Sequence, residues 1–217
     1  MCGRYSFAVE DQLIWERFGV SVRSAIYKAR YNCAPSQDLA VVSDEDPAFL
    51  SFYRWGLIPF WAKEASIGNK MINARAETIL EKPSFRNPFR KQRCLVLSDG
   101  FFEWKKSAVK IPYRICLIDG SPFAMAGIWE RWKNPGGEII RSFSIITTQA
   151  NSLVGELHDR MPVILPREKE KQWLDGGPEI ELLKLLQPYP AEGMKMYPVS
   201  SRVNSPANDG PEILEPV

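Results

Sequence analysis

The chain has 217 residues, 45% of them hydrophobic and 25% charged, and its 28 Lys and Arg against 26 Asp and Glu leave a formal net charge of +2 at pH 7. This composition is typical of a globular protein and excludes disordered and collagen-like chains, while so small a charge neither requires nor forbids a polyanionic partner. No run approaches the ~20 consecutive apolar residues of a membrane helix, and no apolar signal segment follows Arg4, so we expect an intracellular, cytoplasmic protein without a membrane partner.

The first predicted element is a helix over residues 9–18, in which Val9, Ile14 and Phe18 approximate an apolar stripe. Runs of β-branched and aromatic residues then predict strands at residues 39–43, 49–55, 94–98, 113–118, 123–128 and 139–147. Asp119-Gly120 predicts a tight hairpin, and the Pro-Gly-Gly segment at residues 134–137 predicts another turn between two strands. The middle of the chain is therefore predicted to be largely antiparallel sheet.

Helices are predicted to gather late in the chain. Asn151 can cap one over residues 151–157, and Pro166 and Pro178 can open two more, reaching residues 174 and 186. Because helices interrupt the strands at uneven intervals, we predict an α+β fold: a single domain over residues 1–217 with a curved, mainly antiparallel, barrel-like sheet flanked by helices. The polar residues 200–217 are compatible with either an ordered wrap or a loose tail.

The cysteines are scattered, with no Cys-x-x-Cys pair among them. This spacing argues against a zinc site and, in an intracellular protein, against a disulfide framework, so we expect free thiols and no metal or other cofactor. The four are Cys2, Cys33, Cys94 and Cys116.

Cys2 is the first candidate for chemistry. An initiator methionine is generally removed when the next residue is small, and loss of Met1 would leave Cys2 with a free amine beside its thiol. The two groups have pKa values of about 8 and about 8.5, so both nucleophiles exist in useful fractions near neutral pH. An aldehyde would condense with the amine to an imine, which the sulfur would close to a thiazolidine. The alternative is an ordinary buried, apolar cysteine.

Three further residues are candidates for proton transfer or substrate orientation. His158, the only histidine, lies in a polar turn beside Asp159, which suits a general acid or base, although a lone histidine is often structural. Glu103 lies among aromatic residues that would raise the pKa of its carboxyl, but it could equally be an exposed strand residue paired with a lysine. The amide of Asn73 could orient a substrate oxygen or cap a turn.

Arginines and tryptophans indicate where a polyanion could bind. Arginines within two residues of the candidates above could hold phosphates around one site; they are Arg4, Arg75 and Arg160. A basic stretch over residues 82–93 could extend this track or be a solvated face. The tryptophans in the segment from Trp55 to Trp61 could stack on bases or pack in the core.

Taken in order, the segments that carry these candidates match one known pattern. They are Met1-Cys2-Gly3-Arg4, Tyr31-Asn32-Cys33-Ala34-Pro35, Trp55-Gly56-Leu57-Ile58-Pro59, Ile72-Asn73-Ala74-Arg75-Ala76-Glu77-Thr78, Asp99-Gly100-Phe101-Phe102-Glu103-Trp104 and His158-Asp159-Arg160-Met161-Pro162. The chain thereby resembles the SRAP (SOS response-associated peptidase) domain family over nearly its whole length. The resemblance implies the SRAP fold and covalent capture of abasic sites in single-stranded DNA.

The resemblance also implies a role for each candidate. Cys2 would attack the ring-opened deoxyribose aldehyde, Asn73 would position the Cys2 amine and the sugar, Glu103 would assist proton transfer, and His158 would act on the sugar O4′. The DNA-binding residues would be Arg4, Arg75 and Arg160 at flanking phosphates, with Asn32, Pro35, Trp55 and Trp61 along the path of the strand. We therefore expect a DNA-damage-response protein that forms DNA–protein crosslinks by a lyase-like imine chemistry.

Two other functions remain open from the residues alone. One is a cysteine peptidase using Cys2 and His158, and the other is a noncovalent single-strand-binding module. The expected partner is single-stranded DNA containing abasic sites, with replication-fork proteins as further candidates and nucleoid association when bound to DNA. A monomer is expected.

Overall fold

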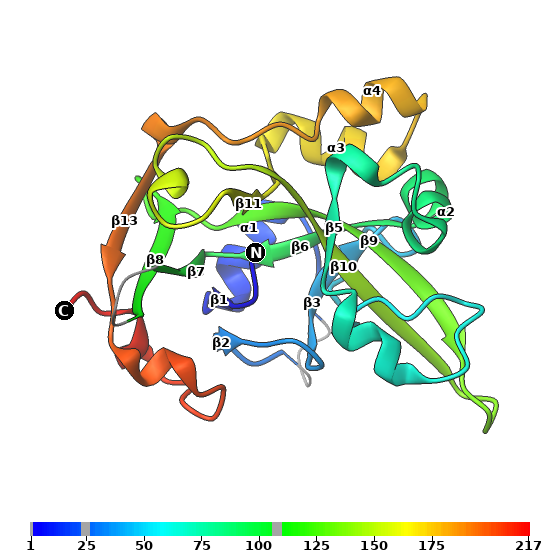
Figure 1. Ribbon diagram of the computed structural model, residues 1–217, viewed down its shortest axis with the longest axis horizontal. Helices are drawn as coiled ribbons and strands as arrows, with labels where there is room; N and C mark the ends of the chain where they lie inside the picture. The colour runs from blue at the N-terminus through cyan, green and yellow to red at the C-terminus, as the bar shows by residue number, and fades with distance from the viewer. Residues whose placement is uncertain (1, 23–26, 106–109) are drawn as a thin grey trace.

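The computed structural model describes residues 2–22, 27–105 and 110–217, and at its centre five strands close into a ring. Their order is β10-β4-β3-β6-β9, and β9 pairs again with β10 (Figure 1). The strands are β3 (Asp38–Ser43), β4 (Ser51–Trp55), β6 (Arg93–Ser98), β9 (Phe123–Lys133) and β10 (Ile139–Gln149). Only β4 runs parallel to its ring neighbour β10, so the curved, mainly antiparallel, barrel-like sheet predicted from the sequence is confirmed.

A second, antiparallel sheet lies beside the ring, with the order β13-β8-β7-β1-β2. It consists of β1 (Tyr5–Phe7), β2 (Arg30–Cys33), β7 (Gly100–Lys105), β8 (Ile111–Leu117) and β13 (Met194–Pro198). β7 follows β6 after the single residue Asp99, which joins the two sheets covalently. Buried side chains of both sheets form one apolar cluster, so the chain start is packed against the ring.

Three short strands complete the sheets: β5 (Asn73–Arg75), β11 (Arg160–Pro162) and β12 (Ile164–Leu165). β5 pairs in parallel with the second half of β10, where Asn73 faces Ile145. β11 pairs antiparallel with the last residues of β10, where Arg160 faces Gln149. The end of β10 is thus the scaffold on which segments around residues 73 and 160 meet.

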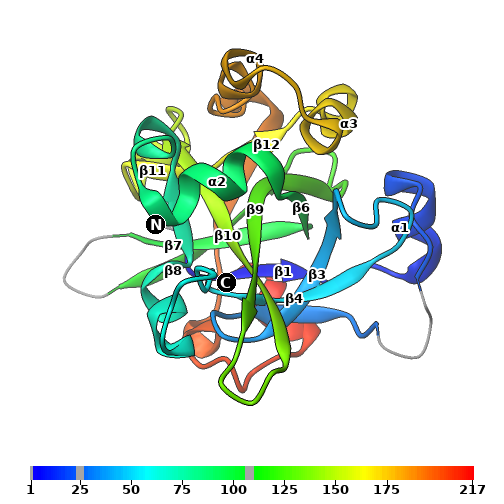
Figure 2. The same ribbon diagram turned by 90° about the vertical axis from the view of Figure 1, so that its right-hand side faces the viewer.

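In the described parts of the chain, four α-helices cover the outside: α1 (Asp11–Phe18), α2 (Pro83–Lys91), α3 (Arg167–Asp175) and α4 (Glu179–Lys184). Figure 2 shows α3 and α4 together above the sheets, with the chain start on one side of the molecule and α1 on the other. Within the described residues, no helix is long and apolar enough to cross a membrane. The predicted helices at residues 9–18, 166–174 and 178–186 are confirmed, whereas α2 lies in the basic stretch over residues 82–93, where the sequence pattern predicts no helix.

Two local predictions are wrong. A turn does form at Gly120 (φ 74°), but the strands on either side, β8 and β9, belong to different sheets, because turn chemistry determines the local chain reversal and not the pairing partner. The predicted helix at residues 151–157 is only a 3-10 turn, Val154–Glu156, although Asn151 Oδ1 does accept a hydrogen bond from Val154 N (2.9 Å). The segment is too short to propagate an α-helix and contains Gly155.

The C-terminal residues form an ordered wrap, which decides the question left open by the sequence. Val203 and Ile213 are buried against Phe102 of β7. A carboxylate oxygen of Asp209 accepts hydrogen bonds from the backbone N–H groups of Tyr31 (2.7 Å) and Asn32 (2.8 Å). The tail therefore completes the open sheet next to the chain start.

Candidate functional site

The start of the chain runs along β7, which brings Cys2 to the candidate site. Phe102 N donates to Arg4 O (2.9 Å), and the β1–β7 register, continued by two residues, puts Gly3 opposite Glu103. The Cys2 side chain is fully buried, and its backbone carbonyl accepts a hydrogen bond from Asn73 Nδ2 (2.8 Å). Asn73, on β5, therefore ties the chain start to the end of β10.

Glu103 is the acidic group of this site and is 4% exposed. Burial raises the pKa of its carboxyl, and the positive charge of His158 is among the opposing influences. Burial, reinforced by the negative charge of Glu103, raises the pKa of the Cys2 thiol to about 12. At neutral pH the thiol consequently keeps its proton, and the carboxyl beside it binds a proton more readily than an exposed glutamate.

His158 lies in the turn before β11. Its Nδ1 accepts a hydrogen bond from Arg160 N (3.0 Å) and lies 2.8 Å from the Asp159 carboxylate. An Nδ1 that accepts from Arg160 N carries no proton, so the contact with Asp159 is an ion pair only when the ring is protonated. In the neutral ring the proton lies on Nε2, which is the nitrogen suited to proton exchange with a substrate. The structure thus brings together the predicted catalytic residues: Asn73 is hydrogen-bonded to Cys2, and Glu103 interacts electrostatically with Cys2 and His158.

The three predicted phosphate-binding arginines differ in their exposure and in their hydrogen-bond partners. Arg75 is exposed on β5, two residues after Asn73. Arg4 is half-buried and donates to Asn32 Oδ1 (2.8 Å) and Val203 O (2.7 Å). The guanidinium of Arg160 forms a bidentate ion pair with the Glu77 carboxylate. Arg75 is therefore accessible, whereas Arg4 and Arg160 are already engaged with protein groups.

Asn32 and Trp55 do not have the exposure that contact with a DNA strand would need, and these two expectations are corrected. Asn32 is fully buried, and its amide donates to backbone carbonyls of the C-terminal wrap; the acceptors are Val203, Ser205 and Asn208. Trp55 is 0% exposed, stacks on Phe143 and donates its indole N–H to Ile72 O (2.9 Å). Both side chains stabilise the fold around the site. Pro35, from the same predicted path, is half-buried beside Ser36.

Trp61 does have the exposure expected of a base-stacking residue, at 50%, and Phe60 beside it is 63% exposed. The loop that carries them is held in place where Gly56 and Gly68 meet. Gly56 has φ 121°, and a Cβ there would lie 2.6 Å from the Gly68 carbonyl oxygen. Glycine is required at this close approach, which fixes the loop relative to β4.

Glu77 is the residue with a visible role at the site that the sequence alone did not single out. It lies in a quoted motif, two residues after Arg75, yet its partner Arg160 is 83 residues away. Proximity to Arg75 was the only local signal. The pairing itself depends on β5 and β11 flanking the same strand.

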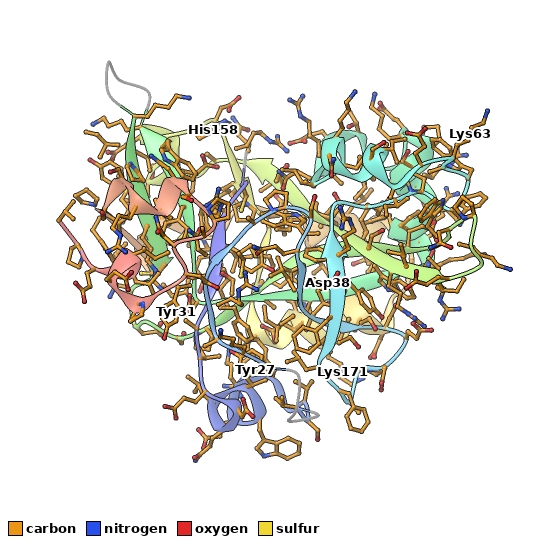
Figure 3. All side chains as sticks on the ribbon, turned by 90° about the horizontal axis from the view of Figure 1, so that it is seen from below. Tyr27, Tyr31, Asp38, Lys63, His158 and Lys171 are labelled. Atoms are coloured by element: carbon orange, nitrogen blue, oxygen red, sulfur yellow. The ribbon has the colours of Figure 1, made fainter. Side chains whose placement is uncertain are left out.

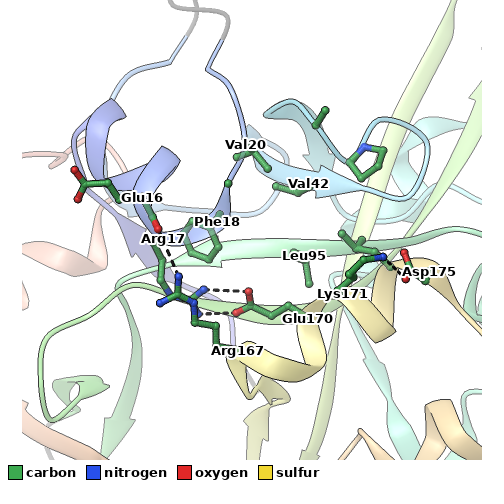
Figure 4. Close-up of a pocket in the computed structure, with 14 residues that line it drawn as sticks. Glu16, Arg17, Phe18, Val20, Val42, Leu95, Arg167, Glu170, Lys171 and Asp175 are labelled. Atoms are coloured by element: carbon green, nitrogen blue, oxygen red, sulfur yellow. Dashed lines mark hydrogen bonds and ion pairs between the residues drawn. The ribbon is translucent and has the colours of Figure 1, made fainter.

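A separate cavity of about 600 Å³ lies between α1 and α3, with the ion pair of Arg17 and Glu170 in its wall (Figure 4). Lys171, which also lines it, lies towards the edge of the molecule opposite His158 (Figure 3). None of the predicted site residues lines this cavity. Across residues 2–22, 27–105 and 110–217, no group of three or more His, Cys, Asp or Glu is arranged to hold a metal ion.

The fold and the site define a class of protein: a β-ring with an attached sheet that places a buried thiol near the start of the chain beside a carboxylate and a histidine. Comparison with known families identifies the class more closely. The SOS response associated peptidase (SRAP) family matches residues 1–206, and the chain belongs to this family. The resemblance seen in the sequence motifs is thereby confirmed.

Individual relatives extend the comparison. The chain is 48% identical over 223 residues to the abasic site processing protein YoqW of Bacillus subtilis, covering 99% of each chain. It is 34% identical to the abasic site processing protein HMCES of Gallus gallus, covering 90% of this chain and 68% of that protein. A crystal structure of a Bacteroides thetaiotaomicron protein superimposes with a TM-score of 0.91 at 34% identity over all of both chains.

Proposed function

We propose that this protein processes abasic sites in single-stranded DNA by forming a thiazolidine crosslink between Cys2 and the ring-opened deoxyribose. The observation that carries the proposal is the buried Cys2 held by Asn73 and placed beside Glu103. An aldehyde is the substrate group that a neighbouring amine and thiol capture together. The names of the relatives, abasic site processing proteins, support the same lesion as substrate.

In the first step the Cys2 amine, freed by removal of Met1, attacks the aldehyde carbon. A C–N bond forms, the carbonyl oxygen leaves as water, and an imine results. Glu103, whose carboxyl pKa is raised by burial, supplies the proton for the departing water. His158 assists the preceding ring opening by proton exchange with the sugar O4′ through Nε2. Asn73 keeps the Cys2 backbone oriented throughout, since it is bonded to the carbonyl.

In the second step the Cys2 sulfur attacks the imine carbon. An S–C bond forms, the C=N bond becomes a single bond, and the thiol proton passes to the nitrogen by way of Glu103. Burial raises the pKa of the Cys2 thiol, so the sulfur keeps its proton at neutral pH and is the poorer nucleophile, which favours the order amine first and sulfur second. Overall, one aldehyde and one aminothiol give one thiazolidine and one water.

DNA on either side of the lesion would contact basic and aromatic groups around the site. Arg75 and the guanidiniums of Arg4 and Arg160 would bind phosphates, and Trp61 would stack on a base. The protein would act as a monomer in the DNA damage response, in the cytoplasm and on the nucleoid, with replication-fork proteins as further partners. No cofactor is needed by this chemistry.

The cysteine-peptidase alternative is less well supported by the site. Peptide hydrolysis by cysteine depends on a thiolate paired with a protonated histidine, which lowers the pKa of the thiol. Here burial and Glu103 raise the pKa of Cys2 instead. The noncovalent binding module uses the same exposed groups but requires neither Cys2 nor Glu103.

Intact mass spectrometry of the full chain tests the proposal. The protein is incubated with single-stranded DNA carrying one abasic site and, in parallel, with the same strand without the lesion. We expect a heat-stable adduct with the abasic strand only, one water lighter than the sum of its parts and mapped to a Cys2 that lacks Met1. With Met1 shown to be absent and the lesion intact, the lack of an adduct would overturn the proposal.

A further inference from the structure

The guanidinium of Arg160, one of the proposed phosphate ligands, is engaged on two sides. Its Nη1 and Nη2 donate to Oε1 and Oε2 of Glu77 at 2.7 and 2.9 Å, and Nη2 also donates to Thr147 O (2.6 Å). The Arg160 side chain is 12% exposed. An arginine is always charged, and so enclosed a charge requires an anionic partner.

Glu77 is placed so that it can leave this pair. Its side chain is 50% exposed and lies on the 3-10 turn Ala76–Thr78. It also lines an open groove of about 420 Å³ between that turn and the segment after α4, which includes Gln187. The carboxylate therefore has space to rotate into without displacing packed side chains.

A carboxylate and a phosphate use a guanidinium in the same way. Each presents two oxygens to the two parallel N–H groups of the fork, so one arginine edge cannot bind both in a bidentate manner. Glu77 is charged when it occupies this edge, because the hydrogen bonds from Arg160 hold the pKa of the Glu77 carboxyl below its usual range. The Glu77 carboxylate and a DNA phosphate therefore compete.

We propose that Glu77 is an internal substitute for a DNA phosphate: it neutralises and orients Arg160 in the free protein and is displaced when the strand binds. This inference rests on the proposed function, since it takes single-stranded DNA as the ligand. Because DNA must break the Glu77–Arg160 pair in order to bind, the free energy of that pair lowers the affinity of the wild-type protein for every strand, with or without a lesion. Intact DNA is then released readily, while a strand with an abasic site is retained by its covalent bond.

The test is the affinity of full-length Glu77→Gln for an intact single-stranded oligonucleotide, measured by fluorescence anisotropy at about 0.1 M salt. Glutamine keeps the shape of the side chain and removes the competing charge. We expect binding to be about three- to tenfold tighter than in the wild type, and Arg160→Ala to bind about tenfold more weakly. The gain from Glu77→Gln should disappear when Arg160→Ala is also present.

Glu45→Gln is the matched control. Glu45 also makes a two-point ion pair with an arginine of β10, to Arg141 Nε (2.9 Å) and Nη2 (3.4 Å). Arg141 and Thr147 are six residues apart on the strand, about 20 Å, which exceeds the screening length of about 10 Å. The affinity of Glu45→Gln should therefore stay within about twofold of the wild type. Equal tightening by the two variants would mean that net charge, and not displacement, sets the affinity, and would overturn the inference.

The remaining outcomes separate this inference from the proposed function. Weaker or unchanged binding by Glu77→Gln, in a protein whose thermal unfolding is like the wild type and which still forms the abasic adduct, overturns the inference alone. A wild-type protein that forms no abasic adduct overturns the proposed function, whatever Glu77→Gln does. If Glu77→Gln unfolds early because the enclosed Arg160 charge has lost its anionic partner, the anisotropy is measured below the unfolding temperature of the variant, with the same tightening expected.

Discussion

The ring and the sheet beside it differ in how their buried titratable groups are grouped. In the ring, the register pairs Val41 with Val96 and Val96 with Met125, so their side chains share one face, and all three are fully buried. In the sheet, the buried groups next to the ring include the Cys2 thiol and the Glu103 carboxyl, both with raised pKa values. The ring also buries a thiol, Cys94 on β6, and a carboxyl, Glu130 on β9, whose pKa values are raised by burial. Beside the sheet, by contrast, the thiol and the carboxyl lie close enough for Glu103 to influence the pKa of Cys2.

The ring and the site also differ in the interactions that stabilise them. The ring closes on itself through backbone pairing. The site instead depends on single polar contacts from distant segments, such as Asn73 to Cys2 and Asp209 to the start of β2. Burial of titratable groups and reliance on contacts between distant segments are expected at a functional site, because function and stability compete for the same residues.

The largest effect expected is that of Cys2→Ala, which should abolish the heat-stable adduct with abasic DNA, because the amine can still form an imine but the sulfur that closes the thiazolidine is gone. Cys116→Ala is the control, since Cys116 is also buried but lies on β8. It should form the adduct as the wild type does. Denaturing gels and intact mass measure both, and a stable adduct with Cys2→Ala would show that the thiol is not the capturing group.

Substitutions of Trp55 and Trp61 should distinguish an effect on the stability of the fold from an effect on DNA binding at the surface. Trp55→Ala removes a fully buried ring and should cost about 3–5 kcal/mol of the free energy of unfolding. Trp61→Ala, at a half-exposed position, should change that free energy by no more than about 0.5 kcal/mol. It should weaken binding to intact single strands by about 1–3 kcal/mol through lost stacking. Urea denaturation and anisotropy measure the two quantities, and comparable stability losses would contradict the assignment.

Removal of the Asp209 contact between the C-terminal wrap and β2 should have an intermediate effect on stability. Asp209→Ala leaves two backbone N–H groups and Arg30, which lies 2.6 Å from the other carboxylate oxygen, without their acceptor. We expect a loss of about 1–3 kcal/mol in the free energy of unfolding. Asp175→Ala, which removes only an exposed pair with Lys171, should lose about 0.3–0.5 kcal/mol. Equal losses in urea titrations would mean that the tail does not stabilise the open sheet.

Much of the fold could be predicted because the ring strands are long enough to carry a pattern. The β-branched run at residues 39–43, which lies in β3, and the Pro-Gly-Gly turn between β9 and β10 are examples. Strands of three to five residues such as β1, β5 and β13 were missed, since a pattern so short is indistinguishable from a loop. Their partners are also distant in sequence, so only the folded chain selects them.

For the site, residue types indicated the chemistry, but exposure could not be read from them. The proposed aminothiol at Cys2 and the proposed proton-transfer role of Glu103 were inferred from their side chains and neighbours. Trp55 and Trp61 have the same chemistry, and only the structure distinguishes the buried one from the exposed one. The Glu77–Arg160 pair depends on two short strands meeting beside β10, which no local pattern reports.

The smallest expected effect on stability comes from Glu103→Gln and depends on pH. The folded-state pKa of Glu103 is raised by burial, so between the unfolded carboxyl value of about 4.3 and the folded value the native protein binds more protons than the unfolded chain. Stability contributed by this group is therefore present below about pH 4 and is lost as pH rises. Glu103→Gln should gain stability relative to the wild type between pH 4 and pH 7, measured by thermal unfolding.

Glu130→Gln makes this prediction discriminating, because Glu130 is a buried carboxyl of the ring strand β9 whose pKa is also raised by burial. Both variants should show the same direction of pH dependence. Of the two variants, Glu103→Gln should slow adduct formation, by about 10²–10⁴-fold, since Glu103 lies beside Cys2 and Glu130 is on the ring strand β9. Equal adduct rates in the two variants would mean that Glu103 is merely another buried acid. A loss confined to Glu103→Gln would show that its position beside the thiol, and not burial alone, makes the carboxyl functional.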